Sequence, residues 1–200
     1  MMRRFAVAIS TVCLALATAG CSRSPRVTFY TLESPAQPMA VAATVAVPAV
    51  SVGPVTLPEV VDRPQFVVRI AANRVEILEM HRWAEPLKSE IPRLIAENLS
   101  SLLGSSRISS YLQHSGVDAE YRVLVDIQRF ESSPGEAVTV DAVWSLRRVA
   151  GGVQKNGRTM VREPIKAGGY DPLVAAYGRA LFAVSSDLAR AIRAEATGGH

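Results

Sequence analysis

The hydrophobic period of this chain changes repeatedly between that of a strand and that of a helix. Apolar residues alternate with polar ones in extended runs and recur at i, i+3, i+4 and i+7 in helical runs. The strand-like segments are 65–70, 74–83, 121–128 and 138–147, and the helical segments are 87–103 and 173–192. The order of strands, helix, strands, helix predicts an α+β fold: a mostly antiparallel sheet with two main helices packed on one face.

Proline positions set the predicted helix ends. Pro92 in a helix interior would cost about 3 kcal/mol, so we place the regular part of the first helix at about 90–103. The residues before it stay open, because Pro86 and Pro92 would each suit a first helical turn. The second helix is expected to begin at Asp171, a good N-cap, and to run to about Ala194.

Turn residues predict the connections between strands. Residues 132–135, Ser-Ser-Pro-Gly, should form a hairpin, and Asn156-Gly157 is the strongest short hairpin signal in the chain. The serine-rich stretch 100–110 is expected to be a helix end followed by a polar loop. Three prolines within 51–64 should confine any strand there to an edge or to short pieces.

The N-terminus has the anatomy of an export signal. Arg3 and Arg4 precede an apolar run, which is followed by small residues, and the run is too short to span a membrane. Cleavage after Ala19 would release a soluble chain, whereas cleavage after Gly20 would expose Cys21 for acylation. We favour acylation at Cys21, because the first alternative leaves a lone thiol in an oxidising compartment.

These features predict three segments. Residues 1–20 are a lipoprotein signal peptide, 21–50 are a lipidated N-terminus and linker, and 51–196 are the α+β domain. A short strand is expected at 29–32. The uncharged Ala/Val/Pro stretch at 34–50 is open between a tether and a strand.

The residues that common enzyme mechanisms require are missing from the sequence. His81 is expected to be a structural or surface histidine, since it has no His or Cys at metal-ligand spacing. Glu85 and Glu90 are interpreted as solvated or capping side chains. We therefore predict no catalysis, no cofactor and no metal site. Without the two leader arginines the chain has 20 basic and 18 acidic residues, so nucleic-acid binding is not expected either.

Residues 52–103 carry a more specific pattern. The pieces are Gly53-Pro54-Val55, Leu57-Pro58, Asp62-Arg63-Pro64-Gln65, His81-Arg82-Trp83-Ala84-Glu85-Pro86-Leu87 and Glu97-Asn98-Leu99. In this order and spacing they resemble the PqiC-type lipoproteins, auxiliary components of ABC-type intermembrane transport systems. The early Phe29-Tyr30-Thr31-Leu32 and the C-terminal helix are also similar to that family.

The resemblance implies a function. Such lipoproteins sit at the inner face of the outer membrane and work with a periplasm-spanning MCE-domain protein and its inner-membrane transport components. The assembly is thought to move phospholipids, and some members form rings, which implies a homo-oligomer. The lipoprotein would be a docking and conduit element anchored in the outer membrane and facing the periplasm. Ser22, in place of an Asp after the cysteine, fits that location.

Seven residues of the pattern are candidates for a partner or structural motif: Asp62, Arg63, Pro64, Arg82, Trp83, Glu85 and Pro86. Trp83 is interpreted as a packed aromatic held by an ion pair between its neighbours, and Asp62-Arg63-Pro64 as a rigid start of a central strand. A different class of function stays open, that of a structural envelope lipoprotein that binds peptidoglycan or assists outer-membrane protein assembly.

Overall fold

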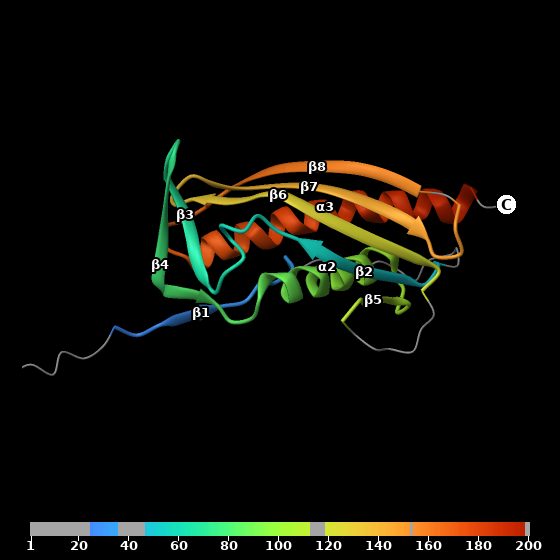
Figure 1. Ribbon diagram of the computed structural model, residues 1–200, viewed down its shortest axis with the longest axis horizontal. Coiled ribbons are helices and arrows are strands. Elements are labelled where there is room, and N and C mark those ends of the chain that lie inside the picture. The colour runs from blue at the N-terminus through green and yellow to red at the C-terminus, as the bar shows by residue number, and fades with distance from the viewer. Residues whose placement is uncertain (1–24, 36–46, 113–118, 153, 199–200) are drawn as a thin grey trace, which may run out of the picture.

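The computed structural model describes residues 25–35, 47–112, 119–152 and 154–198, which form two sheets and two helices (Figure 1). The three-stranded sheet has the order β1-β4-β3, and the five-stranded sheet has the order β5-β2-β6-β7-β8. The elements are β1 (Thr28–Tyr30), β2 (Val50–Thr56), β3 (Gln65–Ala71), β4 (Arg74–Trp83), α2 (Leu87–Leu103), β5 (Ile108–Ser110), β6 (Tyr121–Ser133), β7 (Ala137–Arg148), β8 (Gln154–Pro164) and α3 (Asp171–Gly198).

The long strands of the five-stranded sheet are antiparallel. The turn at 134–136 joins β6 to β7, which confirms the predicted hairpin, and β8 pairs antiparallel with β7. Alternate residues of these strands face the core, among them Val123, Val125, Val140 and Ala142, which are nearly inaccessible to solvent. The period of two in the sequence therefore corresponds to one buried face of a sheet.

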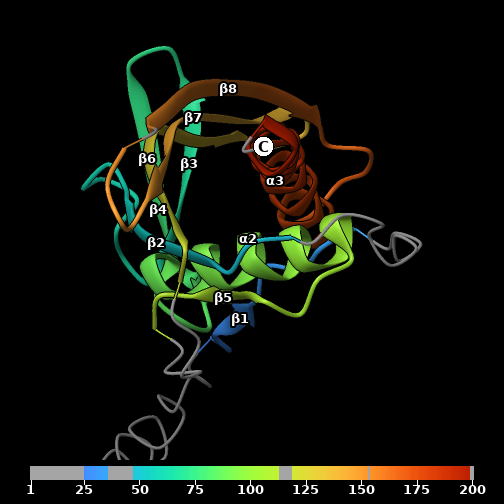
Figure 2. The ribbon, with the colours of Figure 1, turned by 90° about the vertical axis from the view of Figure 1, so that its right-hand side faces the viewer.

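Both helices pack on one side of this sheet (Figure 2). α2 contacts β2, β5 and α3, and α3 contacts β7 and β8. The predicted α+β class is confirmed. α2 begins at Leu87, earlier than the regular helix predicted from about residue 90, and contains Pro92. Pro92 is the sixth helical residue, so its missing N–H removes a single helical hydrogen bond near the N-terminus.

Parallel pairing makes both sheets mixed. β1 is parallel to β4, and β2 is parallel to both β5 and β6, whereas the pairs β3–β4, β6–β7 and β7–β8 are antiparallel. The sequence predicted one mostly antiparallel sheet. Parallel strands need long connections, so the two partners are far apart in the sequence. The alternation within one strand does not show which distant strand pairs with it.

The predicted hairpin at Asn156-Gly157 is wrong. Both residues lie within β8, where Gly157 is opposite Trp144 of β7. A Cβ at residue 157 would overlap the Trp144 ring, so this glycine makes room for an indole rather than for a turn. The chain instead turns at 149–152, where Gly151 and Gly152 have positive φ angles.

Two further expectations failed in the same sheet. β2 is an interior strand despite Pro54, which lies where the β2–β6 register shifts, between Val52 and Val55. Such an irregularity tolerates a residue without an N–H. β5 lies in the serine-rich stretch that was predicted to be helix end and loop. Its three residues are too few to show a period.

Two segmental predictions fall wholly or partly outside the described residues. The leader and Cys21 lie there, as does most of the stretch that was open between tether and strand. The expected strand at 29–32 corresponds to β1 at Thr28–Tyr30. The expected strands at 65–70 and 74–83 correspond to β3 and β4, which are joined by a turn at Ala72 and Asn73.

Candidate functional site

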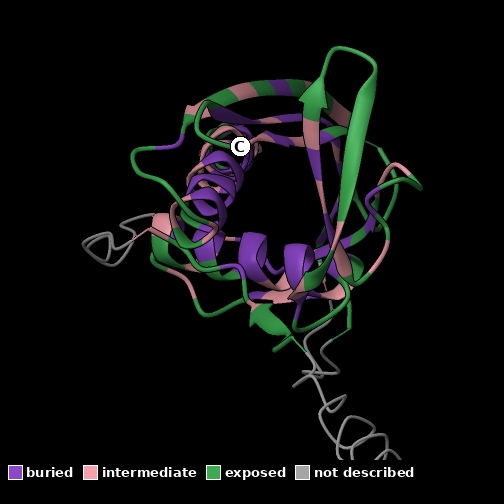
Figure 3. Cartoon of the chain, turned by 90° about the vertical axis from the view of Figure 1, so that its left-hand side faces the viewer, coloured by how far each residue is buried: buried purple, intermediate pink, exposed green. Residues whose placement is uncertain are grey.

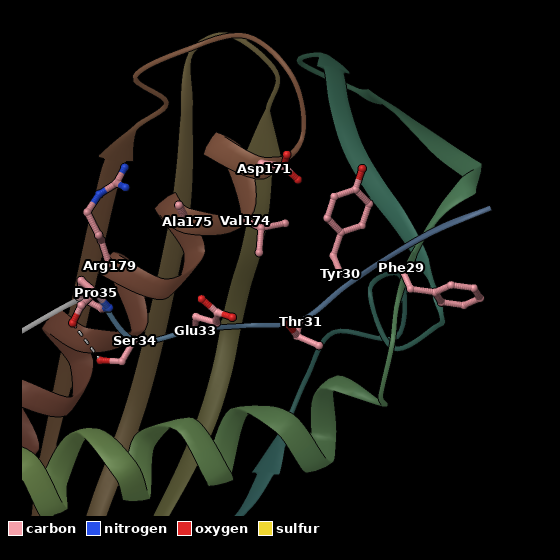
Figure 4. A pocket seen from close by; sticks show the side chains of 10 residues that line it. All are labelled: Phe29, Tyr30, Thr31, Glu33, Ser34, Pro35, Asp171, Val174, Ala175 and Arg179. Carbon is pink, nitrogen blue, oxygen red and sulfur yellow. Dashed lines mark hydrogen bonds between the residues drawn. The ribbon is translucent and has the colours of Figure 1, made fainter. Parts of the chain in front are cut away.

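The first described segment after Cys21 contains a strap, residues 28–35, that runs along α2 and beside the first half of α3 (Figure 4). The strap starts as β1, whose Thr28, Phe29 and Tyr30 pair with the last three residues of β4. The N–H of Ala84 donates to the carbonyl of Tyr30 at 2.8 Å. The strap is therefore part of the fold from β1 onward.

A buried carboxylate of α2 holds the middle of the strap. The N–H of Leu32 donates to Glu90 Oε1 at 2.6 Å, and both residues are almost fully inaccessible to solvent. Burial raises the pKa of Glu90, opposed by the Leu32 hydrogen bond and by Arg93, 3.8 Å away. The second oxygen, Oε2, has no hydrogen-bond partner among the described residues. The expectation of a solvated or capping Glu90 is wrong.

A second polar connection joins the strap to both helices. Ser34 Oγ donates to Asn98 Oδ1 at 2.6 Å, and Asn98 Nδ2 donates to Ser185 Oγ of α3 at 3.2 Å. Nearby, the carbonyl of Glu33 approaches Gly178 so closely that a Cβ there would overlap it. The strap is thus bonded to α2 and packed against α3.

The sequence contains a signal for these buried polar contacts on α2. Glu90 lies three residues after Leu87 and four before Leu94, and Asn98 lies four after Leu94. Both polar residues therefore fall on the apolar stripe of the helix. A polar residue on such a stripe needs a buried partner.

Several of the predicted motif residues meet at one corner beside the strap. The N–H of Trp83 donates to the carbonyl of Pro64 at 2.7 Å, and Lys88 Nζ lies 2.5 Å from Asp62 Oδ2. The carbonyl of Pro86 accepts from Glu90 N–H and so starts α2. The corner therefore connects the loop before β3, the end of β4 and the start of α2. β3 is an edge strand, not the central strand expected after this loop.

The remaining motif residues are arranged differently from the prediction. Arg82 pairs with Glu79 rather than with Glu85, through Nη2–Oε2 at 3.5 Å and a bond from Nε to the Glu79 carbonyl at 2.9 Å. Glu85 is exposed. Arg63 is half-buried, and its Nε has no hydrogen-bond partner among the described residues.

Trp83 is the centre of an aromatic cluster that joins the two sheets and α3. The residue is 6% exposed, and the centroid of its ring lies 4.3 Å from that of Phe66 and 5.9 Å from that of Tyr177. Phe130 of β6 stacks on Tyr177 at 4.1 Å, and burial raises the pKa of Tyr177 above the usual phenol range. Tyr30 of the strap packs on Phe66 at 4.8 Å. Trp83 is packed as expected, by aromatic rings instead of by an ion pair between its neighbours.

His81 lies at the edge of this cluster. Its Nδ1 is 2.8 Å from Tyr30 Oη, and its ring lies 3.9 Å from that of Tyr170. Burial, and to a smaller extent the charge of Asp171, raise the pKa of Tyr30. These contacts place His81 between the strap and the start of α3.

An open cavity of about 410 Å³ lies between the strap and the first turns of α3 (Figure 4). Its lining residues are Phe29, Tyr30, Thr31, Glu33, Ser34, Pro35, Asp171, Val174, Ala175 and Arg179. Arg179 is held by Glu163 at 3.1 Å and by the carbonyl of Pro164 at 2.8 Å. The lining has neither a histidine nor a cysteine, and the strap itself forms one wall of the cavity.

The described ranges contain no group of three or more His, Cys, Asp and Glu side chains suited to a metal ion. Neither α2 nor α3 combines the length and apolar character that crossing a bilayer requires.

Comparison with solved structures shows that the fold occurs elsewhere. A protein described only as uncharacterized aligns with 84% of this chain and 99% of its own, at 20% identity and a TM-score of 0.68. A Xanthomonas campestris protein of the DUF330 family aligns with 82% of this chain and 93% of its own, at 17% identity and a TM-score of 0.65. At these identities the likeness concerns the fold alone. Comparison with curated protein sequences gives no significant match.

A family profile identifies the chain more directly. The profile described as "ABC-type transport auxiliary lipoprotein component" matches residues 30–189. The match begins at the last residue of β1 and ends in α3, so it includes the strap from Tyr30 onward, the motif corner and the aromatic cluster. The chain therefore belongs to the family of ABC-type transport auxiliary lipoproteins, which are anchored to a membrane by lipid.

Proposed function

We propose that this chain is the outer-membrane auxiliary lipoprotein of an ABC/MCE-type system that moves phospholipids between membranes, and that its lipid is attached at Cys21. The observation that carries the proposal is the attachment of the strap to α2. Leu32 and Ser34 lie 11 and 13 positions after Cys21 and are bonded to Glu90 and Asn98 of α2. The segment that leads to the anchor is thus joined to the core.

The short connection supports a docking role. Pro25 is four positions after Cys21, so a fully extended chain would separate their Cα atoms by only about 14 Å. The domain would then remain beside the membrane that holds the lipid. A partner that binds the domain would be held there too, because the strap transmits the attachment to α2 and α3.

The motif corner is the proposed contact for an MCE-domain protein. Of the seven candidates, Asp62, Pro64, Glu85 and Pro86 are exposed, whereas Trp83 is buried in the aromatic cluster. Exposed residues can contact a partner directly, and a buried one acts by holding the corner in shape. We assign the second role to Trp83 and the first to the exposed four. A ring of several copies would present several such corners.

The test compares two cysteines in the bacterium that carries this chain. Cys21→Ala should abolish palmitate labelling and membrane attachment, and it should sensitise the cells to detergent. Cys13→Ala, within the predicted leader, is the matched control and should change none of these. Crosslinking of the wild-type chain should recover an MCE-domain protein with its permease and ATPase.

Two outcomes would contradict the proposal. Labelling that survives Cys21→Ala would exclude this residue as the lipid site. Crosslinked partners limited to peptidoglycan-binding or barrel-assembly proteins would favour an envelope role unrelated to lipid transport.

A further inference from the structure

Exposed apolar side chains gather on the three-stranded sheet. Twelve large apolar residues are exposed in the described parts of the chain, and six of them belong to this sheet or to the residues just before it. The six are Val27, Phe29, Ile70, Val75, Ile77 and Met80. Phe29 has an exposed fraction of 62%, high for an aromatic ring in a strand.

The alternation of side chains puts several of these on one face. Tyr30, Phe66 and Val68 pack toward the core, so Phe29 and Val67 point outward. Most of β4 and the turn that joins it to β3 are exposed (Figure 3). The cross-strand partner of Val67 is Ile77, which shares its outward direction. Val75, two residues before Ile77, lies on the same face. The sheet thus has a buried face over the aromatic cluster and an outer face on which these apolar side chains lie beside Arg69 and Arg82.

The proposed anchor is close to this sheet along the chain. Phe29 is eight positions after Cys21, at most about 29 Å away along a fully extended chain. A bilayer's headgroup region adds about 5–8 Å on each side of its hydrocarbon core. A domain held by so short a connection keeps β1 within reach of the headgroups, whichever way it turns.

We propose that the outer face of the three-stranded sheet rests on the phospholipid surface in which the chain is anchored, with the Phe29 ring in the headgroup region. The inference rests on the proposed lipid attachment at Cys21. Aromatic rings favour the membrane–water interface. The cross-strand partner of Phe29 is Arg82, whose side chain is one-third exposed and also pairs with Glu79. An arginine next to an interfacial ring is suited to a lipid phosphate.

The tether makes a weak contact sufficient. One aromatic ring and a few aliphatic side chains would bind a bilayer only marginally by themselves. Linked to an inserted lipid, the same contact becomes intramolecular, and its effective concentration is set by the short connection. The contact would then fix which face of the domain turns toward the membrane and which faces the periplasm.

The experiment compares two probes of equal exposure. Phe29→Trp replaces the outward ring, and Met160→Trp replaces an equally exposed side chain, 62%, on β8 of the other sheet. Each full chain is purified from membranes and reconstituted in phosphatidylethanolamine/phosphatidylglycerol vesicles with or without brominated acyl chains. The wild type supplies the background from Trp83 and Trp144.

Interfacial groups reach about 5–10 Å into the acyl boundary, so bromine should quench the indole at position 29 roughly twofold and leave that at position 160 unchanged. A chain that does not sediment with the vesicles would contradict both the acylation and the membrane contact. A chain that sediments without quenching at position 29 would contradict the contact alone. A blue shift at position 29 without bromine quenching, in an oligomer, would assign this face to a second copy and overturn the proposal.

Discussion

The outer faces of the two sheets differ, although their inner faces are equally apolar. The three-stranded sheet presents Phe29, Val75 and Ile77 to its surroundings. The outer side of the five-stranded sheet is mostly polar and charged, with Met160 and Val143 as interruptions. Its charged residues include Arg122, Asp126, Arg129, Asp141, Arg147 and Arg158. The same strand period thus supports two surfaces, and we attribute the difference to the medium that each one faces.

The charged face is unevenly paired. Arg158 donates to Asp141 at 2.6 and 2.9 Å, which lowers the pKa of that buried carboxyl. Arg122 and Arg147 are direct cross-strand partners, and neither forms an ion pair within the described residues. Two like charges in such positions repel. The two arginines therefore repel each other on this side of the molecule, and water and salt screen the repulsion.

The largest effect is expected where the two sheets are joined. Trp83→Ala should lower the free energy of unfolding by about 3–5 kcal/mol, because it empties the centre of the aromatic cluster. Trp83→Phe should cost less. Denaturant titration measures both, and hydrogen exchange of β3 and β4 should rise more than that of β6 and β7. Equal acceleration in both sheets would mean that Trp83 does not join two separable units.

The next effect concerns the strap. Glu90→Ala leaves the buried Leu32 N–H without an acceptor, whereas Glu90→Gln retains one, so the Ala variant should be less stable than the Gln variant by about 1–3 kcal/mol. Thermal unfolding checks the pair. An equal stability of the two variants would show that the Leu32 hydrogen bond does not hold the strap.

Glu90 also predicts a pH dependence. Its folded-state pKa is raised, so its favourable contribution is present at pH values below the ordinary carboxyl pKa and is lost as the pH rises through the folded pKa. Relative to Glu90→Gln, the wild type should therefore lose stability as the pH increases above about 4.5. A difference that is constant between pH 4 and 8 would contradict the raised pKa.

An effect of similar size tests the inner face of the five-stranded sheet. Gly157→Ala should cost about 1–3 kcal/mol, because the new methyl group overlaps the Trp144 ring and forces it to move. Gly168→Ala is the control, since an added Cβ there meets nothing within 4 Å. If the two variants had the same melting temperature, the β7–β8 register would be in doubt.

The smallest effect has the opposite sign. The double substitution Arg122→Gln and Arg147→Gln should stabilise the chain at low salt by about 0.2–1 kcal/mol, and the gain should vanish near 1 M salt. Arg158→Gln, which leaves buried Asp141 without its partner, should destabilise instead. A gain from the double variant that persists at high salt would point to a cause other than repulsion.

The sequence predicted what depends on neighbouring residues and missed what depends on distant ones. The turns after β3 and β6 follow from local chemistry, and so do the two helices. The Asn-Gly signal failed because Trp144, 13 positions earlier in the chain, needs the space above Gly157. Parallel partners such as β1 and β4 are separated by more than 40 residues and leave no local pattern.

The candidate site also combines features that could be predicted from nearby residues with features that depend on distant ones. Motif residues from 62–64 and 82–86 meet at one corner, but the ion pair expected around Trp83 is absent there because Arg82 bonds Glu79. The role of Glu90 could not be predicted from its own helix, because it depends on a contact with Leu32, 58 positions away. A pattern within one helix can show that a polar residue falls on the apolar stripe, but it cannot name the partner.

The bonds that hold the strap have a consequence for the order of synthesis, export and folding. The strap is made early, but its partners on α2 come about 60 residues later, and Ser185 on α3 is nearly the last of the network to be synthesised. If the chain is exported N-terminus first and is acylated at Cys21 as proposed, the acylation can precede the formation of these bonds. Only after α3 has arrived can the strap be fully seated. Folding would then convert a flexible connection into a segment that is bonded to α2 and packed against α3. The folded domain would thereby set the direction in which the chain leads to the anchor.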